Sequence, residues 1–315
     1  DNYLHEEPYT STLQQMGIEV LYGQEYLTGI WDWLVKNGKD IHVAYLNRPH
    51  IATKYVDFIK EHTDIKMIYY GHDLHFMREF REYELTGDVK KRQESEYWKS
   101  IEFSLFHKVA VSYYPSYVEE EAIHAVDETI PVKAITAYVY EEFLQNLNKD
   151  FAKREGLLFV GGFAHPPNAD AVLWFAKEVF PKIREQLKVN FYIVGSKVTD
   201  EIKALEQPGN GIIVKGFVSE EELADLYRNC RIVVVPLRYG AGVKGKVVEA
   251  IYNGAPIVTT SVGSEGIPDV EKVLLVKDQP DEFAETVVEL YKDEKRLEDL
   301  AEKTQVGGQA VLGRQ

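Results

Sequence analysis

Short apolar runs rich in β-branched residues alternate with longer amphipathic stretches along nearly the whole chain. The rhythm appears twice, first between residues 18 and 136 and again from residue 157 onward. Strands that alternate with helices predict βαβ units and a parallel sheet, because parallel neighbours need a long crossover connection. Two such series predict two sheets, and 315 residues are enough for two domains.

The predicted strands fall into two groups. Those of the first series lie at 18–22, 41–46, 66–71, 108–112 and 132–136. Those of the second lie at 157–162, 191–195, 212–216, 232–237, 256–260 and 273–276. The second group is almost continuously apolar, which is typical of sheets covered on both faces. We predict helices at 25–36, 50–61 and 75–106, and a helix capped by Ser219 with Glu222 three residues on.

A polar stretch at 145–156, "QNLNKDFAKREG", separates the two series. We therefore predict one domain over 1–150 and another over 151–315. Each is expected to be a Rossmann-like, doubly wound α/β domain, and the two face each other across a cleft. Ligands of such sheets bind at the carboxyl ends of the strands, so the loops that follow the strands are the places to search for a site.

Charge and cysteine content exclude several classes of protein. Acidic residues exceed basic ones by 15, which argues against nucleic acid as a partner. No apolar run approaches the roughly 18 residues of a membrane-spanning helix. Cys230 is the single cysteine, which we interpret as a buried thiol, and it fits a reducing compartment. We expect a cytoplasmic protein; contact with the inner membrane face or with a second copy stays open.

Three loops after strands of the second series are rich in glycine or polar residues. The first, "VGGFAHPPN" at 160–168, contains Gly161, Gly162, Phe163 and Asn168. A glycine pair between a strand and a helix lets backbone N–H groups approach a phosphate. We predict these four as ligand-binding residues, and a simple tight turn is the alternative.

The second loop, at 238–250, precedes a helix and combines glycines with cations. Its candidate residues are Arg238, Gly240, Gly242, Lys244, Lys246 and Glu249. The lysines stand where the helix dipole disfavours cations, a local conflict that a bound diphosphate resolves. Glu249, one turn after Lys246, is placed to accept hydrogen bonds from a ribose. The alternative is a solvated helix start with an ion pair between Lys246 and Glu249.

The third loop, "TSVGSEGI" at 260–267, contains Glu265 and Gly266. It follows a strand that we predict to neighbour the one before the second loop. Glu265 is a candidate acceptor for sugar hydroxyls, or else an ordinary turn residue.

Residues 157–292 resemble the nucleotide-binding half of the family 4 glycosyltransferases. The resemblance rests on an ordered set of motifs: "LLFVGGF", "FYIVG", "VKGFVSEEELADLYRNCRIVVVPL", "GKVVEAIYNGAPIVTTSVGSEGI" and "DEFAETVVELYKDE". "HPPNADAVLWF" and "PLRYGAGVKGKV" are most similar to a bacterial subgroup associated with cell-surface polysaccharides. The resemblance implies the GT-B fold of two facing Rossmann-like domains. It also implies a nucleoside diphosphate sugar as donor substrate, with no cofactor and no metal.

The chain departs from the family pattern at three positions. The family commonly has two Glu residues separated by seven others; Glu249 matches the second, but Ala241 takes the first place. Gly162 and Pro167 stand where the family commonly has Arg and Lys for phosphate. We expect Lys244, Lys246 and Arg238 to supply the missing charge. Retention at the anomeric carbon is the family expectation, and Ala241 leaves it open.

The first series resembles the family less. "MIYYGHDLHFMRE" places His72 and Asp73 after a strand, where family members often have His-Asp. With Glu249, they are our predicted catalytic residues. His72 contacts the transferred sugar or leaving group, and Asp73 orients it or acts as a base toward the acceptor hydroxyl. The alternative is that Asp73 caps the following helix and His72 only packs.

Further candidates for the acceptor side are Arg48, His50, His75 and Arg78. The family's first strand and its glycine-rich loop have no counterpart here. We therefore expect a first domain without that strand, because the chain is either a fragment or a reduced version.

The predicted activity is transfer of a hexose-like unit from a nucleoside diphosphate sugar to a hydroxyl of a saccharide, lipid-linked or protein acceptor. One alternative is a sugar-nucleotide epimerase of the same fold, which would turn over donor without acceptor. The other is a catalytically inactive, sugar-nucleotide-binding partner subunit. The sugar, the base, the acceptor and the oligomeric state stay open.

Overall fold

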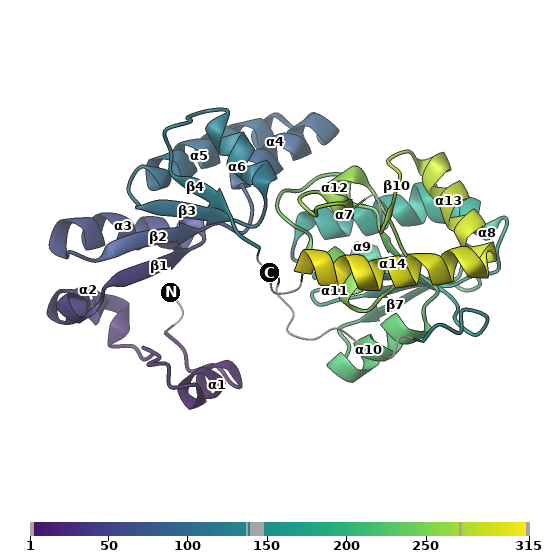
Figure 1. Ribbon diagram of the computed structural model, residues 1–315, viewed down its shortest axis with the longest axis horizontal. Coiled ribbons are helices and arrows are strands. Elements are labelled where there is room, and N and C mark those ends of the chain that lie inside the picture. The colour runs from purple at the N-terminus through teal and green to yellow at the C-terminus, as the bar shows by residue number, and fades with distance from the viewer. Residues whose placement is uncertain (1–2, 137, 139–147, 271–272, 313–315) are drawn as a thin grey trace.

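The structure is a computed structural model that describes residues 3–136, 138, 148–270 and 273–312. Figure 1 shows two lobes, each built around its own sheet. The chain passes from one lobe to the other through residues 139–147, which lie outside the described residues. The boundary that we placed between residues 150 and 151 therefore stays a prediction.

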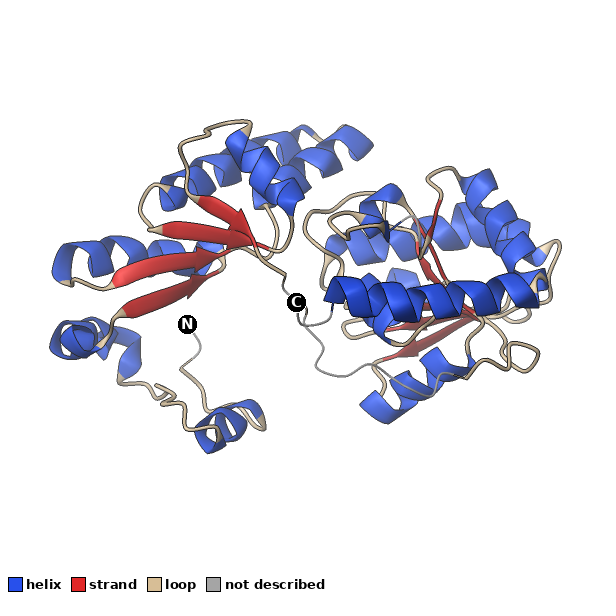
Figure 2. Cartoon of the chain, viewed as in Figure 1, coloured by secondary structure: helices blue, strands red, loops and turns tan. Residues whose placement is uncertain are grey.

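The first lobe has four parallel strands, which follow chain order across the sheet. They are β1 (Val43–Asn47), β2 (Lys66–Tyr70), β3 (Val111–Tyr114) and β4 (Val132–Ala134). The helices are α1 (Tyr9–Gln15), α2 (Tyr26–Asn37), α3 (Pro49–His62), α4 (His75–Thr86), α5 (Val89–Phe106) and α6 (Tyr117–His124), with a 3₁₀ turn η1 (Gly38–Asp40). Figure 2 shows the two sheets, in red, in separate lobes.

Residues 18–22, which we predicted as a strand, do not form one. A strand needs a neighbour for its backbone hydrogen bonds. Among the described residues, β1 pairs only with β2, and 18–22 does not take its other side. Ile18 is accordingly 46% exposed. The alternation of apolar and polar residues is a weak signal where no partner strand is at hand.

The long helical pattern of 75–106 forms two helices rather than one. Gly87 ends α4 in the left-handed conformation, with φ of 72°, which glycine adopts without steric cost. The Asp88 side chain then begins α5 by accepting a hydrogen bond from the backbone N–H of Lys90 at 2.9 Å. The charged residues that run through both helices conceal this break in the sequence.

The second lobe holds six parallel strands in the order β10-β9-β8-β5-β6-β7. The strands are β5 (Leu157–Val160), β6 (Phe191–Val194), β7 (Ile212–Gly216), β8 (Ile232–Val235), β9 (Ile257–Thr259) and β10 (Leu275–Val276). The chain moves outward from β5 to β7 and then returns to β8 on the other side of β5. This reversal makes the sheet doubly wound, and its switch point lies between β5 and β8.

The helices of the second lobe flank this sheet. They are α7 (Pro166–Trp174), α8 (Phe180–Arg184), α9 (Asp200–Lys203), α10 (Glu220–Asn229), α11 (Gly245–Tyr252), α12 (Ser261–Ser264), α13 (Pro280–Lys292) and α14 (Glu294–Leu312), with a π-turn η2 (Phe175–Val179). The predicted cap of α10 is confirmed, since Ser219 Oγ accepts a hydrogen bond from the Glu222 N–H at 3.2 Å. The C-terminal α14 packs against α11.

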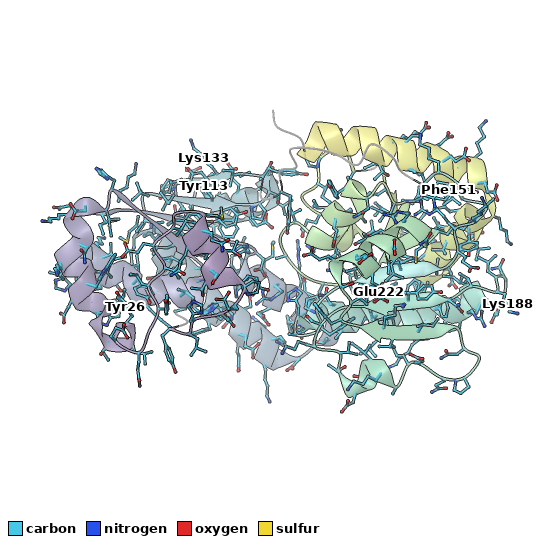
Figure 3. All side chains as sticks on the ribbon, turned by 90° about the horizontal axis from the view of Figure 1, so that it is seen from below. Tyr26, Tyr113, Lys133, Phe151, Lys188 and Glu222 are labelled. Carbon is cyan, nitrogen blue, oxygen red and sulfur yellow. The ribbon has the colours of Figure 1, made fainter. Side chains whose placement is uncertain are left out.

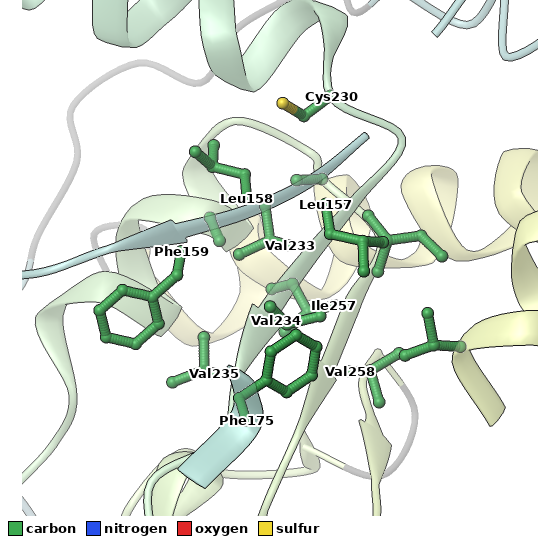
Figure 4. Packing of buried hydrophobic residues seen from close by; sticks show 14 of the residues in the cluster. Leu157, Leu158, Phe159, Phe175, Cys230, Val233, Val234, Val235, Ile257 and Val258 are labelled. Atoms are coloured by element: carbon green, nitrogen blue, oxygen red, sulfur yellow. The ribbon is translucent and has the colours of Figure 1, made fainter. Parts of the chain in front are cut away.

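The strands of the two sheets differ in how deeply they are buried. All four residues of β8 and all three of β9 are buried, as the continuous apolar pattern predicts. Figure 4 shows their side chains packed with those of β5 and with Phe175, and Cys230 at the edge of this cluster. Burial raises the pKa of the Cys230 thiol to about 12. In β1, by contrast, Val43 and Tyr45 are half exposed. Figure 3 places labelled side chains of both lobes, such as Tyr113 and Glu222.

A close backbone contact between two loops of the second lobe gives a test of the fold. Gly195 has φ of +152°, and a Cβ there would lie 1.9 Å from the carbonyl oxygen of Gly161. We predict that Gly195→Ala lowers the free energy of unfolding by about 3 kcal/mol or more, through overpacking and backbone strain.

Gly209→Ala is the matched control for urea unfolding. Gly209 also has a positive φ, of +81°, but no atom lies within 4 Å of its added Cβ. Its substitution should lower stability by only about 1 kcal/mol, from backbone strain alone. Equal losses in the two variants would contradict the contact.

Candidate active site

The switch point of the second sheet brings two of the predicted loops side by side. Lys246, at the start of α11, donates a hydrogen bond from Nζ to Asn168 Oδ1 in α7 at 2.8 Å. Asn168 Nδ2 in turn donates to the Gly162 carbonyl at 2.8 Å. A Cβ on Gly161 would lie 3.0 Å from Asn168 Nδ2 and 3.2 Å from Lys246 Cε, so a larger residue there would crowd both side chains. The "GG" loop and the lysine loop thus lie in contact with each other, and their role as one ligand site stays a prediction.

Among the described residues, no carboxylate pairs with Lys246. Burial, together with the charge of Lys244, lowers the pKa of its ammonium group to about 8. Its polar partner is the neutral amide of Asn168, and its ammonium also lies over the Phe159 ring, 5.9 Å from the centroid. A largely buried cation is unfavourable when no anion compensates its charge. The arrangement favours an anionic ligand at this point.

Lys244 has a different environment. It is only 8% exposed, and its ammonium donates to the Gly242 carbonyl and lies 3.5 Å from Glu265 Oε2. Burial lowers its pKa, while Glu265 acts in the opposite direction. Two side chains predicted as separate ligand contacts, Lys244 and Glu265, are therefore paired with each other here.

The glycine loop touches the first lobe directly. Gly242 has φ of +77°, and a Cβ there would lie 2.6 Å from the His72 carbonyl oxygen and 3.2 Å from Asp73 Cβ. The Gly242 N–H donates to Glu119 Oε1 of α6 at 2.8 Å. The loop of the second lobe and the His-Asp segment of the first thus form two walls of the same site.

A charged pair also joins the lobes at this place. Arg81 of α4 binds Glu265 through two hydrogen bonds of 2.8 and 2.6 Å and donates to the Gly240 carbonyl at 2.6 Å. Gly266, with φ of +75°, lies against Ser116, since a Cβ there would be 2.6 Å from Ser116 Cβ. Glu265 therefore serves the interface between lobes in this state rather than facing an open cleft.

Two predicted donor-binding side chains point elsewhere. Arg238 forms a two-bond ion pair with Asp170 of α7 and lies over the Trp174 ring at 5.9 Å. Phe163 is 4% exposed and stacks on Phe159 with centroids 6.1 Å apart. Arg238 is thus neutralised within its own lobe, and Phe163 belongs to the core.

Glu249 is half-buried in α11. Burial raises the pKa of its carboxyl group, and a hydrogen bond from Tyr227 of α10 opposes that effect. The ion pair between Lys246 and Glu249, which was the alternative interpretation, does not form, because Lys246 turns toward Asn168. The Glu249 carboxylate, in the helix that follows the lysine loop, is therefore not neutralised by Lys246.

His72 and Asp73 follow β2, as predicted. His72 is exposed and shares a hydrogen bond of 2.8 Å between Nε2 and Asn47 Oδ1. Partial burial lowers the pKa of His72, and the charge of Arg48 lowers it further. The ring is accordingly neutral at pH 7 and can both donate and accept one hydrogen bond.

Asp73 does not cap α4, so that alternative is wrong. The backbone N–H groups of His75 and Phe76 instead donate to the fully buried Glu102 of α5, at 2.9 and 3.1 Å. Asp73 forms an ion pair with Arg78. Glu102 thus does the capping and leaves Asp73 on the side of the glycine loop.

The remaining acceptor-side candidates are His75, which packs beneath the site, and Arg48 and His50, which lie near the start of α3. His75 lies 3.4 Å from Glu102 and packs against Trp98, so it is part of the support under the site. Arg48 lies between β1 and α3 in a positive-φ conformation, with φ of 60°. The pKa of His50 is lowered by partial burial and then by the neighbouring His75 and Arg48.

Several residues at the site escaped the sequence interpretation. His165 begins α7, and partial burial, followed by the charge of Arg78, lowers its pKa to about 4, while Asp73 acts in the opposite sense. Glu119, Arg81 and Glu102 lie on helices whose charge patterns look like ordinary solvated faces. The position of His165 three residues after the glycine pair, in the same loop, was the one available signal.

The described residues contain no group of three or more His, Cys, Asp or Glu side chains placed to hold a metal ion. Within the same residues, the helices are all too short or too polar to cross a bilayer.

The two parallel-sheet lobes with their facing loops define the GT-B fold. Residues 154–293, most of the second lobe, match the family model described as glycosyl transferases group 1. The lobe that holds the lysine loop is therefore similar to the group 1 glycosyl transferase domains.

The structural neighbours have the same fold at low sequence identity. The chain is similar to Alr3699/HepE of Anabaena, solved with UDP and glucose, at TM-score 0.73 and 15% identity over 98% of this chain and 86% of that one. It is also similar to sucrose-phosphate synthase (tll1590) of Thermosynechococcus elongatus, at TM-score 0.71 and 16% identity over 94% of this chain and 76% of that one.

One curated relative matches part of the chain. It is an uncharacterized 44.6 kDa protein in the cps region of Klebsiella pneumoniae, 33% identical over 136 residues. The match covers 41% of this chain and 33% of that protein.

The unpaired charge of Lys246 gives a pH-dependent test. Its pKa is lower in the folded protein, about 8, than in the unfolded chain, about 10.5. Its charge therefore destabilises the fold fully below pH 8, and the destabilisation disappears as the pH rises from 8 to 10.5. We predict that Lys246→Met gains stability relative to the parent at pH 7, and that this gain shrinks by on the order of 2 kcal/mol at pH 10.

Urea unfolding of both proteins at pH 7 and pH 10 measures this change. Lys182→Met is the control, because Lys182 is exposed and paired with Asp281. A difference between Lys246→Met and the parent that stays the same at both pH values would show that Lys246 is not held in an unfavourable charged state.

Proposed function

We propose that the protein is a glycosyltransferase that moves a sugar from a nucleoside diphosphate sugar to an acceptor hydroxyl. The carrying observation is Lys246, a largely buried cation beside the "GG" loop that pairs with no carboxylate among the residues the structure describes. A donor diphosphate supplies the missing anion. The Gly162 loop, the first turn of α7 and the first turn of α11 surround the same point, and helix N-termini stabilise anions.

In this proposal, departure of the nucleoside diphosphate is stabilised by Lys246 and by backbone N–H groups, without a metal or a cofactor. Lys244 can also stabilise the departing diphosphate if its ion pair with Glu265 breaks. Gly162 and Pro167 carry no charge, so the lysine loop replaces what the GG loop lacks.

The first lobe supplies the transferred sugar and the acceptor with polar groups. A neutral His72 is suited to contact a sugar hydroxyl. Asp73, in its ion pair with Arg78, is suited to orient the acceptor hydroxyl or take its proton. Arg48 and His50, at the start of α3, are proposed to contact the acceptor. Retention at the anomeric carbon is the proposed outcome.

The names of similar proteins support the donor class. HepE was solved with UDP-glucose, and a pneumococcal O-GlcNAc transferase, GtfA, with UDP and GlcNAc at TM-score 0.61. We propose a UDP-linked sugar as the first donor to test. The cps-region relative supports a role in surface polysaccharide synthesis. A nucleotide-sugar substrate and a single buried thiol fit a cytoplasmic location, which is part of the proposal.

Binding of a diphosphate should change the protonation of Lys246. Because the free ammonium has a pKa of about 8, and an adjacent anion raises it, we predict uptake of a proton when UDP binds at pH 8.5. Calorimetry in two buffers of different ionisation enthalpy measures the uptake. Lys246→Ala should abolish it and weaken UDP by about 10- to 100-fold, the value of a charge-assisted hydrogen bond.

Lys182→Ala is the control for this titration, as it removes an exposed lysine of the same lobe. It should keep both the affinity and the proton uptake. Full UDP affinity in Lys246→Ala would place the diphosphate elsewhere. Lys244→Ala, made separately, tells whether the second lysine contributes.

Glu249 is the proposed acceptor for the ribose hydroxyls. A carboxylate accepts only, so it suits a diol that donates twice. We predict that the parent prefers UDP over 2′,3′-dideoxy-UDP, and that Glu249→Ala weakens UDP by on the order of 2 kcal/mol and loses that preference. Glu249→Gln should weaken UDP less. Competition binding with both nucleotides measures the preference.

Thermal unfolding separates this result from a folding defect, because Glu249 also interacts with the hydroxyl of Tyr227, which favours its charged form. Tyr227→Phe is the matched control: it removes that hydroxyl and leaves the carboxylate. If Glu249→Ala keeps the preference for ribose, Glu249 is a structural residue of α11.

A further inference from the structure

A carboxylate of the first lobe holds the backbone of the glycine loop in the second. Glu119 Oε1 accepts the Gly242 N–H at 2.8 Å, and its other oxygen, Oε2, accepts a hydrogen bond from Ser116 Oγ. The side chain is 0% exposed. Both oxygens are thus occupied, one inside the first lobe and one across the interface.

The cap of α6 is supplied by Ser116, whose side chain accepts a hydrogen bond from the Val118 N–H at 3.2 Å. Burial raises the pKa of Glu119, although the bond from Ser116 opposes this. A cavity between the lobes borders Ser116, Val243 and Gly266, and Glu119 itself is shielded from solvent. A carboxylate in such a place is unfavourable unless its partners are specific.

The bond determines how one peptide unit is oriented. The Gly242 N–H is held by Glu119, and the Gly242 carbonyl accepts from Lys244 Nζ. Gly242 has φ of +77°, and its Cα lies against His72. Rotation of the Gly242 backbone would break the hydrogen bond to Glu119. The same rotation would also displace the ammonium group of Lys244. Glu119 therefore fixes the position of a cation that it does not itself bond.

We propose that Glu119 is a positioning residue for the donor: it holds the Gly242 peptide so that the lysine loop is preshaped for a diphosphate. This rests on the proposed donor site. Its consequence is that donor affinity, although located in the second lobe, depends on a side chain of the first. A preshaped loop binds more tightly because less conformational freedom is lost on binding.

Two conservative variants separate reach from charge. Glu119→Gln keeps an acceptor oxygen at the same reach and removes the charge. Glu119→Asp keeps the charge and withdraws the acceptor by about 1.5 Å, one carbon–carbon bond. If Glu119 acts by holding Gly242, UDP should bind Glu119→Gln within about threefold of the parent and Glu119→Asp about tenfold or more weakly.

Glu120→Ala is the matched control in the same helical turn. Glu120 Oε2 also accepts a backbone N–H, from Ala134 at 2.7 Å, but within its own lobe. It should lower thermal stability without a change in UDP affinity. Hydrolysis of a UDP-sugar, with water as the acceptor, can be followed by the UDP that it releases. In this assay Glu119→Asp should show a raised KM for the UDP-sugar and an unchanged kcat.

The outcomes are distinct. Full affinity in Glu119→Asp overturns the inference while the proposed function stands. Weak binding in Glu119→Gln with full affinity in Glu119→Asp also overturns it, because charge and not the hydrogen bond would then matter. Equal loss in Glu120→Ala would assign the effect to general destabilisation and overturn it too. If the unaltered chain binds no nucleoside diphosphate, the proposed function fails and the inference with it.

Discussion

The fit of Gly242 between the two lobes is the contact on which the site depends. Its N–H donates to Glu119, and its Cα leaves no space for a Cβ against the His72 carbonyl. Any larger residue would separate the lobes or rotate the peptide. The loop after β8 and the segment after β2 therefore have one relative position in this structure, and the proposed donor and acceptor walls share a backbone contact.

Charge is distributed unevenly around that contact. Arg81, Glu119, Lys244 and Glu265 form a nearly neutral set at the interface, in which each cation faces a carboxylate. Lys246, by contrast, donates to the neutral amide of Asn168, and no carboxylate in the described part of the chain pairs with it. Paired charges stabilise burial, whereas an isolated one does not. The interface and the proposed anion site thus differ in electrostatics, although a single short loop supplies both lysines.

Much of the second lobe was predictable, because its strands are apolar throughout and its helices carry local caps such as Ser219. The switch point then forces the loops after β5 and β8 together, which is why Lys246 and the glycine pair meet as expected. What the sequence could not give were the partners over long separations. Arg238 meets Asp170, and Glu102 caps α4 from another helix. Such pairings depend on tertiary packing, which local sequence patterns do not reveal.

The same limit explains the errors in the first lobe. Residues 18–22 have the composition of a strand but, among the residues that the structure describes, no neighbouring strand to pair with. Asp73 is a residue type that often caps helices, but it does not cap α4. His165 and Glu119 looked ordinary because each gains its role from a lobe far away in the sequence. Residues that join domains carry little local signal, since their environment is made by the other domain.

Cys230 makes the molecule convenient to observe. Its thiol is 3% exposed and stays protonated at neutral pH, because burial raises its pKa to about 12. A cysteine introduced on the surface of each lobe would therefore react with a maleimide dye or spin label while the native thiol remains silent. The separation between two such labels reports directly whether the lobes move apart when substrate arrives, with no need to remove a native cysteine first.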